Sequence, residues 1–297
     1  MPARRLRLGQ AALTMNRTNT LERVVPPRIS AGIRQQGYDH VGGYVARALE
    51  VARLSPAQLV REWGLIYPGS PFPDQPEHLD VLRFPSHPLM ALREPGPTDP
   101  RPWPTYSSGL LLGASSAPVW LLGRTRLPVA AELWRTTASG QTRLATFEGP
   151  ARGWRGSRGY HPPTDLVGIR AVWHDLELPA ELSRDGATVE LVVVGGAAPE
   201  GFDQVRPGVW RRSVPRDQVD RVFEPVLTCT YRDVPCRILQ RALEDSRLLL
   251  LSDHPENARW LGADEVDVGS YEVEAATAEL TDLRLVIVEC RDGDDSR

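Results

Sequence analysis

The chain has 297 residues, of which 41% are hydrophobic and 25% are charged, and its formal net charge is -3. These values are typical of a soluble globular protein, and the length favours two domains or a row of small modules. The small net charge excludes a global attraction to nucleic acid or anionic lipid. All 35 basic residues are arginines. Because lysine is absent, the sequence excludes a Walker A loop, a protein-kinase phosphate lysine, and pyridoxal phosphate or other Schiff-base chemistry on lysine.

The ends of the chain and its cysteines predict a cytoplasmic protein. The longest apolar runs, such as Leu191–Val194 and Leu248–Leu251, are far shorter than the roughly 18 residues of a membrane span, so no membrane partner is predicted. Three cysteines form an odd and low count that argues against a disulfide framework and favours the reducing cytoplasm. We expect residues 1–27 to form a loose tail, with Met15 as an alternative start, and the aspartate-rich residues 291–297 to be disordered.

Residues 28–67 are predicted to form a small helical module. Apolar residues over 41–52 recur at i, i+3, i+4 and i+7, which indicates an amphipathic helix that Asp39 would cap. Ser55 and Gln58 have the spacing of a capping box, so a second helix is expected to begin there.

The next segment, residues 68–116, is rich in proline. It has eleven prolines in the 37 residues from Pro68 to Pro104, which excludes a continuous helix or a central strand there. Its apolar residues are too numerous to remain solvated, so we expect an extended chain wrapped against a folded surface. A short edge strand is predicted at Asp80–Phe84.

The remaining chain contains an internal repeat. Residues 171–176 read Ala-Val-Trp-His-Asp-Leu, and residues 229–234, at an offset of 58, read Cys-Thr-Tyr-Arg-Asp-Val. Further on, residues 202–210 match residues 263–271 at an offset of 61. A fainter copy, with the same features in the same order, lies within residues 117–169. Units of this length are too long for solenoid repeats and have the size of small barrels.

The pattern within each unit predicts a hairpin, a central apolar strand, a turn with glycine and an aromatic residue, and a short helical turn before a last strand. The predicted fold class is therefore α+β, mostly β, with a small N-terminal helical module followed by three tandem SH3-like small β-barrel units. A continuous β-sandwich and barrels closed by strands of neighbouring units are the alternatives. The predicted barrel units are residues 117–169, 170–225 and 226–290.

Two cysteines are predicted to lie side by side. If residues 232–233 form the turn of a hairpin, Cys229 lies directly opposite Cys236. The equivalent residues of the preceding unit, Ala171 and Leu178, are a plain apolar pair. This favours buried, reduced and inert thiols over a redox or metal pair.

No metal, cofactor or catalytic residue is predicted from local motifs. The six histidines do not occur at His-x-x-His or His-x-x-x-His spacing, and the sequence has no Cys-x-x-Cys pair. It also lacks the Gly-x-Ser-x-Gly motif of serine hydrolases and a glycine-rich loop in a strand-to-helix context.

The most unusual stretch is 152–161, which has three arginines and two aromatic residues among three glycines. This composition suits a phosphate, a nucleotide or an acidic partner, through bidentate contacts and stacking. A glycine-rich hairpin with exposed arginines is the alternative. The candidate binding residues, including two from the proline-rich segment, are Arg152, Trp154, Arg155, Arg158, Tyr160, Arg83 and His87.

The last unit is acidic. Such a surface repels phosphate backbones, so a nucleic-acid partner is disfavoured and a basic protein partner is favoured. The predicted acidic partner face consists of Asp264, Glu265, Asp267, Glu272 and Glu274.

Three segments carry a resemblance: residues 38–45, the Gly-Trp-Arg-Gly of 153–156, and the Gly-Ser-Tyr-Glu-Val of 269–273. In these the chain resembles uncharacterised proteins from GC-rich actinobacterial genomes. The resemblance covers most of residues 28–290 and implies a bacterial cytoplasmic protein of an accessory kind, without an activity to carry over.

Three functions remain open at the level of the sequence. The favoured one is a non-enzymatic protein that binds another protein, as an immunity or antitoxin-type inhibitor does. The second is an enzyme acting on a nucleotide or dinucleotide, such as an NAD glycohydrolase or an ADP-ribosyl transferase, with Arg83, His87, Arg155 and Arg158 in one cleft. The third is a nucleic-acid-binding barrel array. Whether those four residues converge is expected to separate the three.

Overall fold

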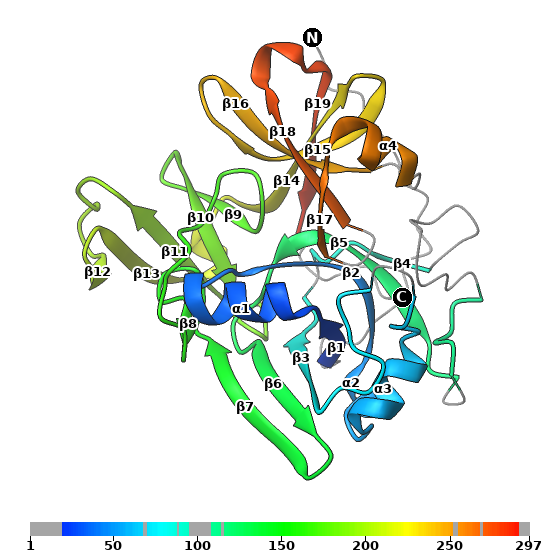
Figure 1. The fold of residues 1–297 in the computed structure, drawn as a ribbon. Helices are drawn as coiled ribbons and strands as arrows, with labels where there is room; N and C mark the ends of the chain where they lie inside the picture. The colour runs from blue at the N-terminus through cyan, green and yellow to red at the C-terminus, as the bar shows by residue number, and fades with distance from the viewer. Residues whose placement is uncertain are drawn as a thin grey trace, which may run out of the picture.

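The structure, a computed structural model, contains two antiparallel β-sheets and a few short helices (Figure 1). Among the described residues, no helix combines the length and the apolar composition needed to cross a membrane. The described residues are 20–67, 70–87, 89–94, 108–113, 116–251, 255–267 and 270–290. The predicted tail 291–297 and the alternative start at Met15 lie outside them.

The first sheet has eight strands and is built from the N-terminal half of the chain. Its strands are, in spatial order, β4 (Leu92–Arg93), β5 (Val119–Arg126), β2 (His40–Arg47), β1 (Thr20–Val25), β3 (His78–Pro85), β6 (Glu132–Thr137), β7 (Gly140–Phe147) and β8 (Trp154–Arg155). Both outermost strands, β4 and β8, have only two residues. Short outer strands leave little free backbone for pairing with another chain.

Short helices accompany the first sheet. Helix α1 (Pro27–Gln36) begins at a proline, ends at Gly37 with a φ of 77°, and packs Ile29 and Ile33 into one core cluster. Helices α2 (Ala48–Val51) and α3 (Pro56–Glu62) contribute to a second cluster. The capping box predicted at Ser55 and Gln58 is confirmed, because both of its hydrogen bonds are present.

The second sheet has eleven strands and is built from the C-terminal half. Ten follow one path, in the order β12 (Asp203–Arg206), β13 (Val209–Pro215), β11 (Thr188–Val194), β10 (Leu176–Leu182), β9 (Arg170–Trp173), β14 (Arg221–Tyr231), β15 (Val234–Arg241), β16 (Asp245–Leu250), β18 (Ser270–Ala276) and β17 (Asp264–Asp267). The last strand, β19 (Thr281–Glu289), lies off this path and pairs with β14.

The second sheet contains two units with the same strand order. We call residues 170–224 unit A and residues 226–289 unit B. The two-residue turns 174–175 and 232–233 are equivalent, and all four of their residues have positive φ. A 3₁₀ turn precedes the last strand of each unit, η1 (Arg216–Gln218) and η2 (Thr277–Glu279). Unit B has an extra helix, α4 (Pro255–Leu261), which accounts for the change of offset from 58 to 61.

One detail of the predicted repeat is displaced by one residue. The sequence matches Leu191 with Leu249. In the structure, Leu191 lies opposite Ala180, and Ile238, the residue of unit B that is equivalent to Ala180, lies opposite Leu248. Leu248 is therefore the counterpart of Leu191. An irregularity in the pairing of β15 and β16 just after Ile238 shifts the register, and the sequence pattern carries no sign of it.

The described strand pairs do not close into barrels. The two units share β14, which pairs with β9 at its start and with β15 at its end, so they form one continuous sheet. The segment predicted as barrel unit 1, residues 117–169, is not a separate sheet. Its strand β5 pairs with β2 and its strand β6 pairs with β3, so it completes the sheet begun by the N-terminal residues.

The helix predicted over 41–52 is wrong for most of its length. Residues 40–47 form β2, and only Ala48–Val51 are helical. Both faces of β2 are buried, because Val41 and Val45 belong to one core cluster and Ala46 to the other. A strand buried on both faces is apolar at successive positions, which imitates helical spacing.

Two further expectations about the N-terminal half are wrong. The loose tail predicted for residues 1–27 contains β1 from Thr20 onward, which lies between β2 and β3 and buries Leu21 completely. The predicted edge strand at Asp80–Phe84 is part of β3, which pairs with β1 on one side and with β6 on the other. Its prolines do not interrupt it, because the strand ends at Pro85.

Buried arginines connect the two sheets. Arg23 and Arg124 of the first sheet form ion pairs with Asp267 and Glu272 of the second, at 2.8 Å and 3.0 Å. Thr125 donates a hydrogen bond of 2.9 Å to Glu224 of β14. A guanidinium group suits such sites because it offers several donors in fixed directions.

The predicted cysteine pair is confirmed. Cys229 lies opposite Cys236 in the β14–β15 hairpin, and both thiols are free and buried. Burial raises the pKa of both thiols, that of Cys236 to about 12. The thiols are therefore protonated at neutral pH, which suits inert core residues.

Candidate functional site

The arginine-rich stretch 152–161 is committed to internal contacts. Trp154 is buried against Phe147, and its indole N–H donates to the carbonyl of Tyr38 at 2.9 Å. The Tyr160 hydroxyl donates to the carbonyl of Pro150, and the guanidinium of Arg206 lies 3.8 Å from the centre of the Tyr160 ring. Both aromatic rings are therefore occupied within the protein.

Two of the three arginine side chains of this stretch also have partners. Arg152 lies 3.5 Å from a carboxylate oxygen of Glu190, and Arg155 lies 2.9 Å from one of Glu148. The backbone N–H of Arg158 donates to the carbonyl of Arg34. The stretch thus attaches α1 and the first sheet to the second sheet.

The residues predicted to share one cleft lie apart. Arg83 and His87 line a pocket of about 440 Å³ between the two sheets, together with residues of the β10–β11 connection. Arg158 lines a different pocket, beside α1 and β3, and Arg155 lines neither of the two. Arg83 is also bound to Glu22 at 2.5 Å, and the four residues do not share either of these two pockets.

His87 is a partly buried residue that lines the pocket between the sheets. Its Nδ1 accepts a hydrogen bond from the backbone N–H of Leu89 at 3.2 Å. Burial lowers the pKa of His87 to about 4, so the ring is neutral at pH 7.

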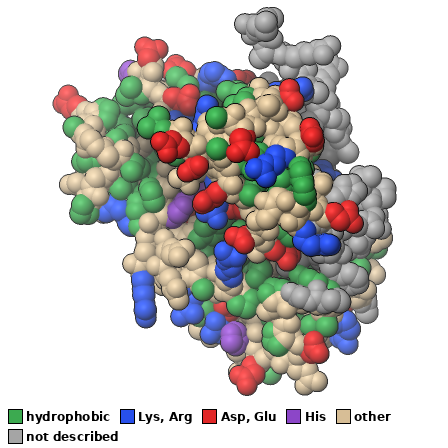
Figure 2. Space-filling view, turned by 45° about the horizontal axis from the view of Figure 1, so that its top comes forward, with side chains coloured by type: hydrophobic (Ala, Val, Ile, Leu, Met, Phe, Trp, Pro, Cys, Tyr) green, Lys and Arg blue, Asp and Glu red, His purple; other side chains and the backbone are tan. Residues whose placement is uncertain are grey.

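The predicted acidic face is wrong for two of its five residues. Asp267 and Glu272 are buried and form the ion pairs with Arg23 and Arg124 that join the sheets. Asp264, Glu265 and Glu274 are exposed. Figure 2 shows acidic side chains interspersed with arginines over the visible face. The acidic residues of unit B therefore divide between structure and surface.

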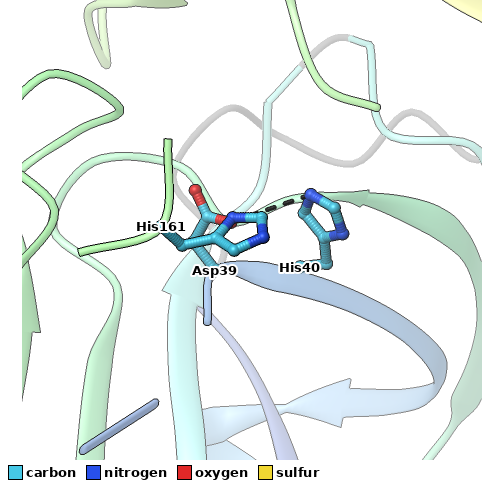
Figure 3. A group of neighbouring side chains, drawn as sticks. All are labelled: Asp39, His40 and His161. Atoms are coloured by element: carbon cyan, nitrogen blue, oxygen red, sulfur yellow. Dashed lines mark hydrogen bonds and ion pairs between the residues drawn. The ribbon is translucent and has the colours of Figure 1, made fainter. Parts of the chain in front are cut away.

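Asp39, His40 and His161 converge, and we call these three residues the Asp39 cluster (Figure 3). Asp39 directly precedes β2, His40 is the first residue of that strand, and His161 belongs to the connection between the two sheets. The side chains of Asp39 and His40 are almost completely buried, whereas that of His161 is 31% exposed.

Two glycines allow the chain segments of the cluster to approach. A Cβ atom on Gly37 would lie 2.7 Å from the carbonyl oxygen of Gly159, and one on Gly159 would lie 2.6 Å from that of Gln35. Real Cβ atoms do not come so close to a carbonyl oxygen, so larger residues would push the segments apart. The close approach places His161 beside Asp39.

The two carboxylate oxygens of Asp39 face different partners. Oδ1 lies 3.0 Å from Nδ1 of His161 and 3.7 Å from Nε2 of His40, whereas Oδ2 lies 3.2 Å from Nε of Arg126. Burial alone would raise the pKa of Asp39, but the hydrogen bond with His161 and the charge of Arg126 hold it below its ordinary value. Burial lowers the pKa of His40 to about 3. The cluster thus holds a carboxylate beside a neutral imidazole at pH 7.

Sequence reasoning missed the Asp39 cluster. Asp39 was expected to cap a helix, and the adjacent Asp39 and His40 lie 122 and 121 positions from His161. The usual local spacings of metal-binding histidines therefore do not apply. The sequence shows only that each of the two segments, Gln35-Gln36-Gly37 and Arg158-Gly159-Tyr160, contains a glycine. The close backbone approach that these glycines allow is visible in the structure.

The strand β19 has one edge paired with β14, and we call its opposite edge the β19 edge. In the described part of the chain, β14 is its only strand partner. Leu283 and Leu285 of β19 are 45% and 55% exposed. This strand has nine residues, whereas the strands β4, β8, β12 and β17 at the other sheet margins have two to four.

The corresponding strand of unit A is covered. At the offset of 61, Leu283 corresponds to Val222 and Leu285 to Glu224, and these two residues of β14 are 1% and 4% exposed. One edge of β14 pairs with β9, and the other pairs antiparallel with β19, so Phe223 lies opposite Arg170 on one side and Glu289 on the other. In unit B the position that β19 fills in unit A has no described occupant.

No protein-family model, curated protein or solved structure matches this chain.

Proposed function

We propose that the protein binds another protein, which adds an extended strand to the β19 edge. The observation that carries this proposal is the long margin of β19, with its exposed leucines, at a position that the preceding unit fills with a strand. We also interpret both units as SH3-like. Their shared strand order, with the last strand beside the first after a 3₁₀ turn, supports that interpretation.

Strand addition uses groups that β19 already presents. An unpaired edge offers a row of backbone N–H and C=O groups, and main-chain hydrogen bonds to an added strand supply affinity. Side chains at alternate positions then supply specificity. Because β19 itself joins β14 in antiparallel orientation, the partner strand is expected to run antiparallel to β19.

The partner segment is expected to be apolar at alternate positions. Leu285 lies opposite Leu227 of β14, so an apolar row already crosses these two strands. A partner residue on the same face would extend that row past Leu285 and bury it. Such contacts are weakly screened by salt, unlike recognition by the exposed acidic residues Asp264, Glu265 and Glu274. The low cysteine count favours a partner in the reducing cytoplasm.

Site-specific photo-crosslinking tests the proposal. A photoreactive phenylalanine analogue replaces Leu285 in one variant and Leu243 in a matched control. Leu243 is 100% exposed in the connection between β15 and β16 of the same unit. In the native host, the probe at position 285 is expected to label one protein within an extended segment, and the probe at 243 is not.

A synthetic peptide of the labelled segment then gives a direct measurement. We expect Leu285→Lys to weaken peptide binding at least tenfold and Leu243→Lys to leave it unchanged, while peptide binding slows hydrogen exchange in β19. Equal binding by wild type and Leu285→Lys contradicts the proposal. Crosslinks only between two copies of the chain, with a dimer in light scattering, also overturn it, because β19 is then a homodimer edge.

A further inference from the structure

Three potential metal ligands of the Asp39 cluster converge. One ligand atom from each of Asp39, His40 and His161 lies within 4.8 Å of the other two. The donors come from two imidazoles and one carboxylate, which is a common ligand set for transition metals. Figure 3 shows the three side chains directed toward one another, Asp39 and His40 from the start of β2 and His161 from the connection between the sheets.

An independent observation also indicates a missing ligand. Nε2 of His40 has no hydrogen-bond partner among the described residues, although the side chain is only 8% exposed. A buried polar atom without a partner costs free energy, and most such atoms in folded proteins are paired. This nitrogen faces Oδ1 of Asp39 at 3.7 Å, too far for a hydrogen bond. An ion between the two atoms would give Nε2 of His40 a partner.

The remaining contacts of Asp39 are compatible with an ion. Arg126 faces Oδ2 and leaves Oδ1 to the imidazoles. Outer-shell donors of this kind commonly orient a ligating carboxylate. The partial exposure of His161 opens the cluster to solvent.

We propose that Asp39, His40 and His161 bind one divalent first-row transition-metal ion of the zinc class. The ion takes Oδ1 of Asp39, Nε2 of His40 and Nδ1 of His161, and water completes its coordination. His161 then carries its proton on Nε2, and the hydrogen bond between Nδ1 and Asp39 is replaced by the two bonds to the ion. The site joins the start of β2 to the connection between the sheets, independently of the β19 edge.

The test uses the full chain without a histidine tag, with Zn²⁺ and Co²⁺ as probes. Competition against a chromophoric chelator measures Zn²⁺ affinity and stoichiometry, and the visible absorption of Co²⁺ reports inner-sphere ligands. We expect one ion per chain and a melting temperature that rises with Zn²⁺. Replacement of the exposed ligand, His161→Gln, is expected to weaken Zn²⁺ binding by more than the roughly 10–100-fold typical of outer-shell changes.

Two further variants separate the site from other histidines and from misfolding. His78→Gln removes an exposed imidazole outside the cluster and is expected to leave affinity and stoichiometry unchanged. Gly159→Ala keeps all three donors, but its Cβ would lie 2.6 Å from the carbonyl oxygen of Gln35, so it is expected to weaken binding by displacing His161. Folding of each variant is checked by circular dichroism.

Specific results overturn the proposal. Zn²⁺ binding that is equal in wild type and folded His161→Gln places the ion elsewhere. Failure of wild type to compete with a chelator of micromolar affinity for Zn²⁺, with no change in melting temperature, shows that the cluster is a hydrogen-bonded network of the apo-protein.

Discussion

The last strands of units A and B occupy the same place in the repeat but have opposite surroundings. In unit A, Val222 packs into a core cluster and Glu224 accepts a hydrogen bond from Thr125 of the first sheet, and both side chains are buried. In unit B, their counterparts Leu283 and Leu285 are about half exposed. The difference lies in the neighbours, because the strand order of the two units is the same. A repeated unit can therefore be internal structure in one copy and leave a strand edge without a described partner in the next.

The comparison also shows how residue type follows surroundings. Glu224 accepts hydrogen bonds from Thr125 at 2.9 Å, from Arg237 at 3.2 Å and from the backbone of Gly168 at 3.3 Å. Of these donors, Thr125 belongs to the first sheet, which packs on this part of β14. Leu285 instead lies opposite Leu227, and an apolar side chain there suits a surface that another chain covers.

The largest expected effect comes from removing the buried carboxylate of unit A. Glu224→Ala leaves Arg237 buried without its ion-pair partner and is expected to lower the free energy of unfolding by about 4 kcal/mol. The matched control is Glu289→Ala, which breaks the exposed Arg221–Glu289 pair and is expected to cost less than about 1 kcal/mol. Urea denaturation measures both. Similar decreases in the free energy of unfolding for the two variants would contradict the difference in burial between the two last strands.

The next prediction concerns the cores of the two units. Leu191 and its counterpart Leu248 are both 0% exposed, so Leu191→Ala and Leu248→Ala are each expected to cost about 3 kcal/mol. Because the units share β14, both substitutions should shift one common unfolding transition, followed by calorimetry. Two transitions, each sensitive to only one substitution, would show that the units unfold separately.

A third prediction follows from a buried acid that unit B lacks. Burial raises the pKa of Glu181 to about 8 from 4.5, and its counterpart at the offset of 58 is the apolar Leu239. Between these pH values the unfolded chain loses the proton and the folded chain keeps it. The stability of the wild type should therefore fall as pH rises through this window, by up to about 1.4 kcal/mol per pH unit from this group.

Glu181→Gln tests this pH dependence. The amide oxygen can still accept the hydrogen bond that Val129 donates to Oε1 of Glu181 at 3.2 Å. Denaturant titrations from pH 5 to pH 8, the range set by the pKa of about 8, should show a flatter profile for the variant and higher stability than wild type at the alkaline end. Parallel profiles for the two proteins would refute the assignment.

The smallest expected effect on stability is at the β19 edge. Leu285→Lys changes an exposed residue and is expected to alter the free energy of unfolding by no more than about 0.5 kcal/mol. Val222→Lys, at the covered position of unit A, should instead destabilise the fold by several kcal/mol because it buries a charge. Thermal denaturation compares them. A large loss from Leu285→Lys would mean that part of this protein covers the edge.

The sequence by itself determined the features that depend on a few neighbouring residues. The capping box at Ser55, the turn at 232–233 and the opposition of Cys229 and Cys236 all follow from local backbone geometry. The repeat of units A and B is also visible in the sequence, because equivalent residues of both units meet equivalent turns and strands. Local rules work here because short-range hydrogen bonds and allowed φ values are the same in every context.

Only the tertiary structure decided which strands are buried and which side chains from distant segments come into contact. Residues 40–47 became a strand because two cores cover both of its faces. The Asp39 cluster formed because Gly37 and Gly159 let segments over 120 positions apart touch. Arg155 and Arg158 separated from Arg83 and His87 for the same reason, since distant segments are placed by the packing of whole sheets. Val222 and Leu283 occupy equivalent repeat positions, but Val222 packs into a core cluster whereas Leu283 is 45% exposed.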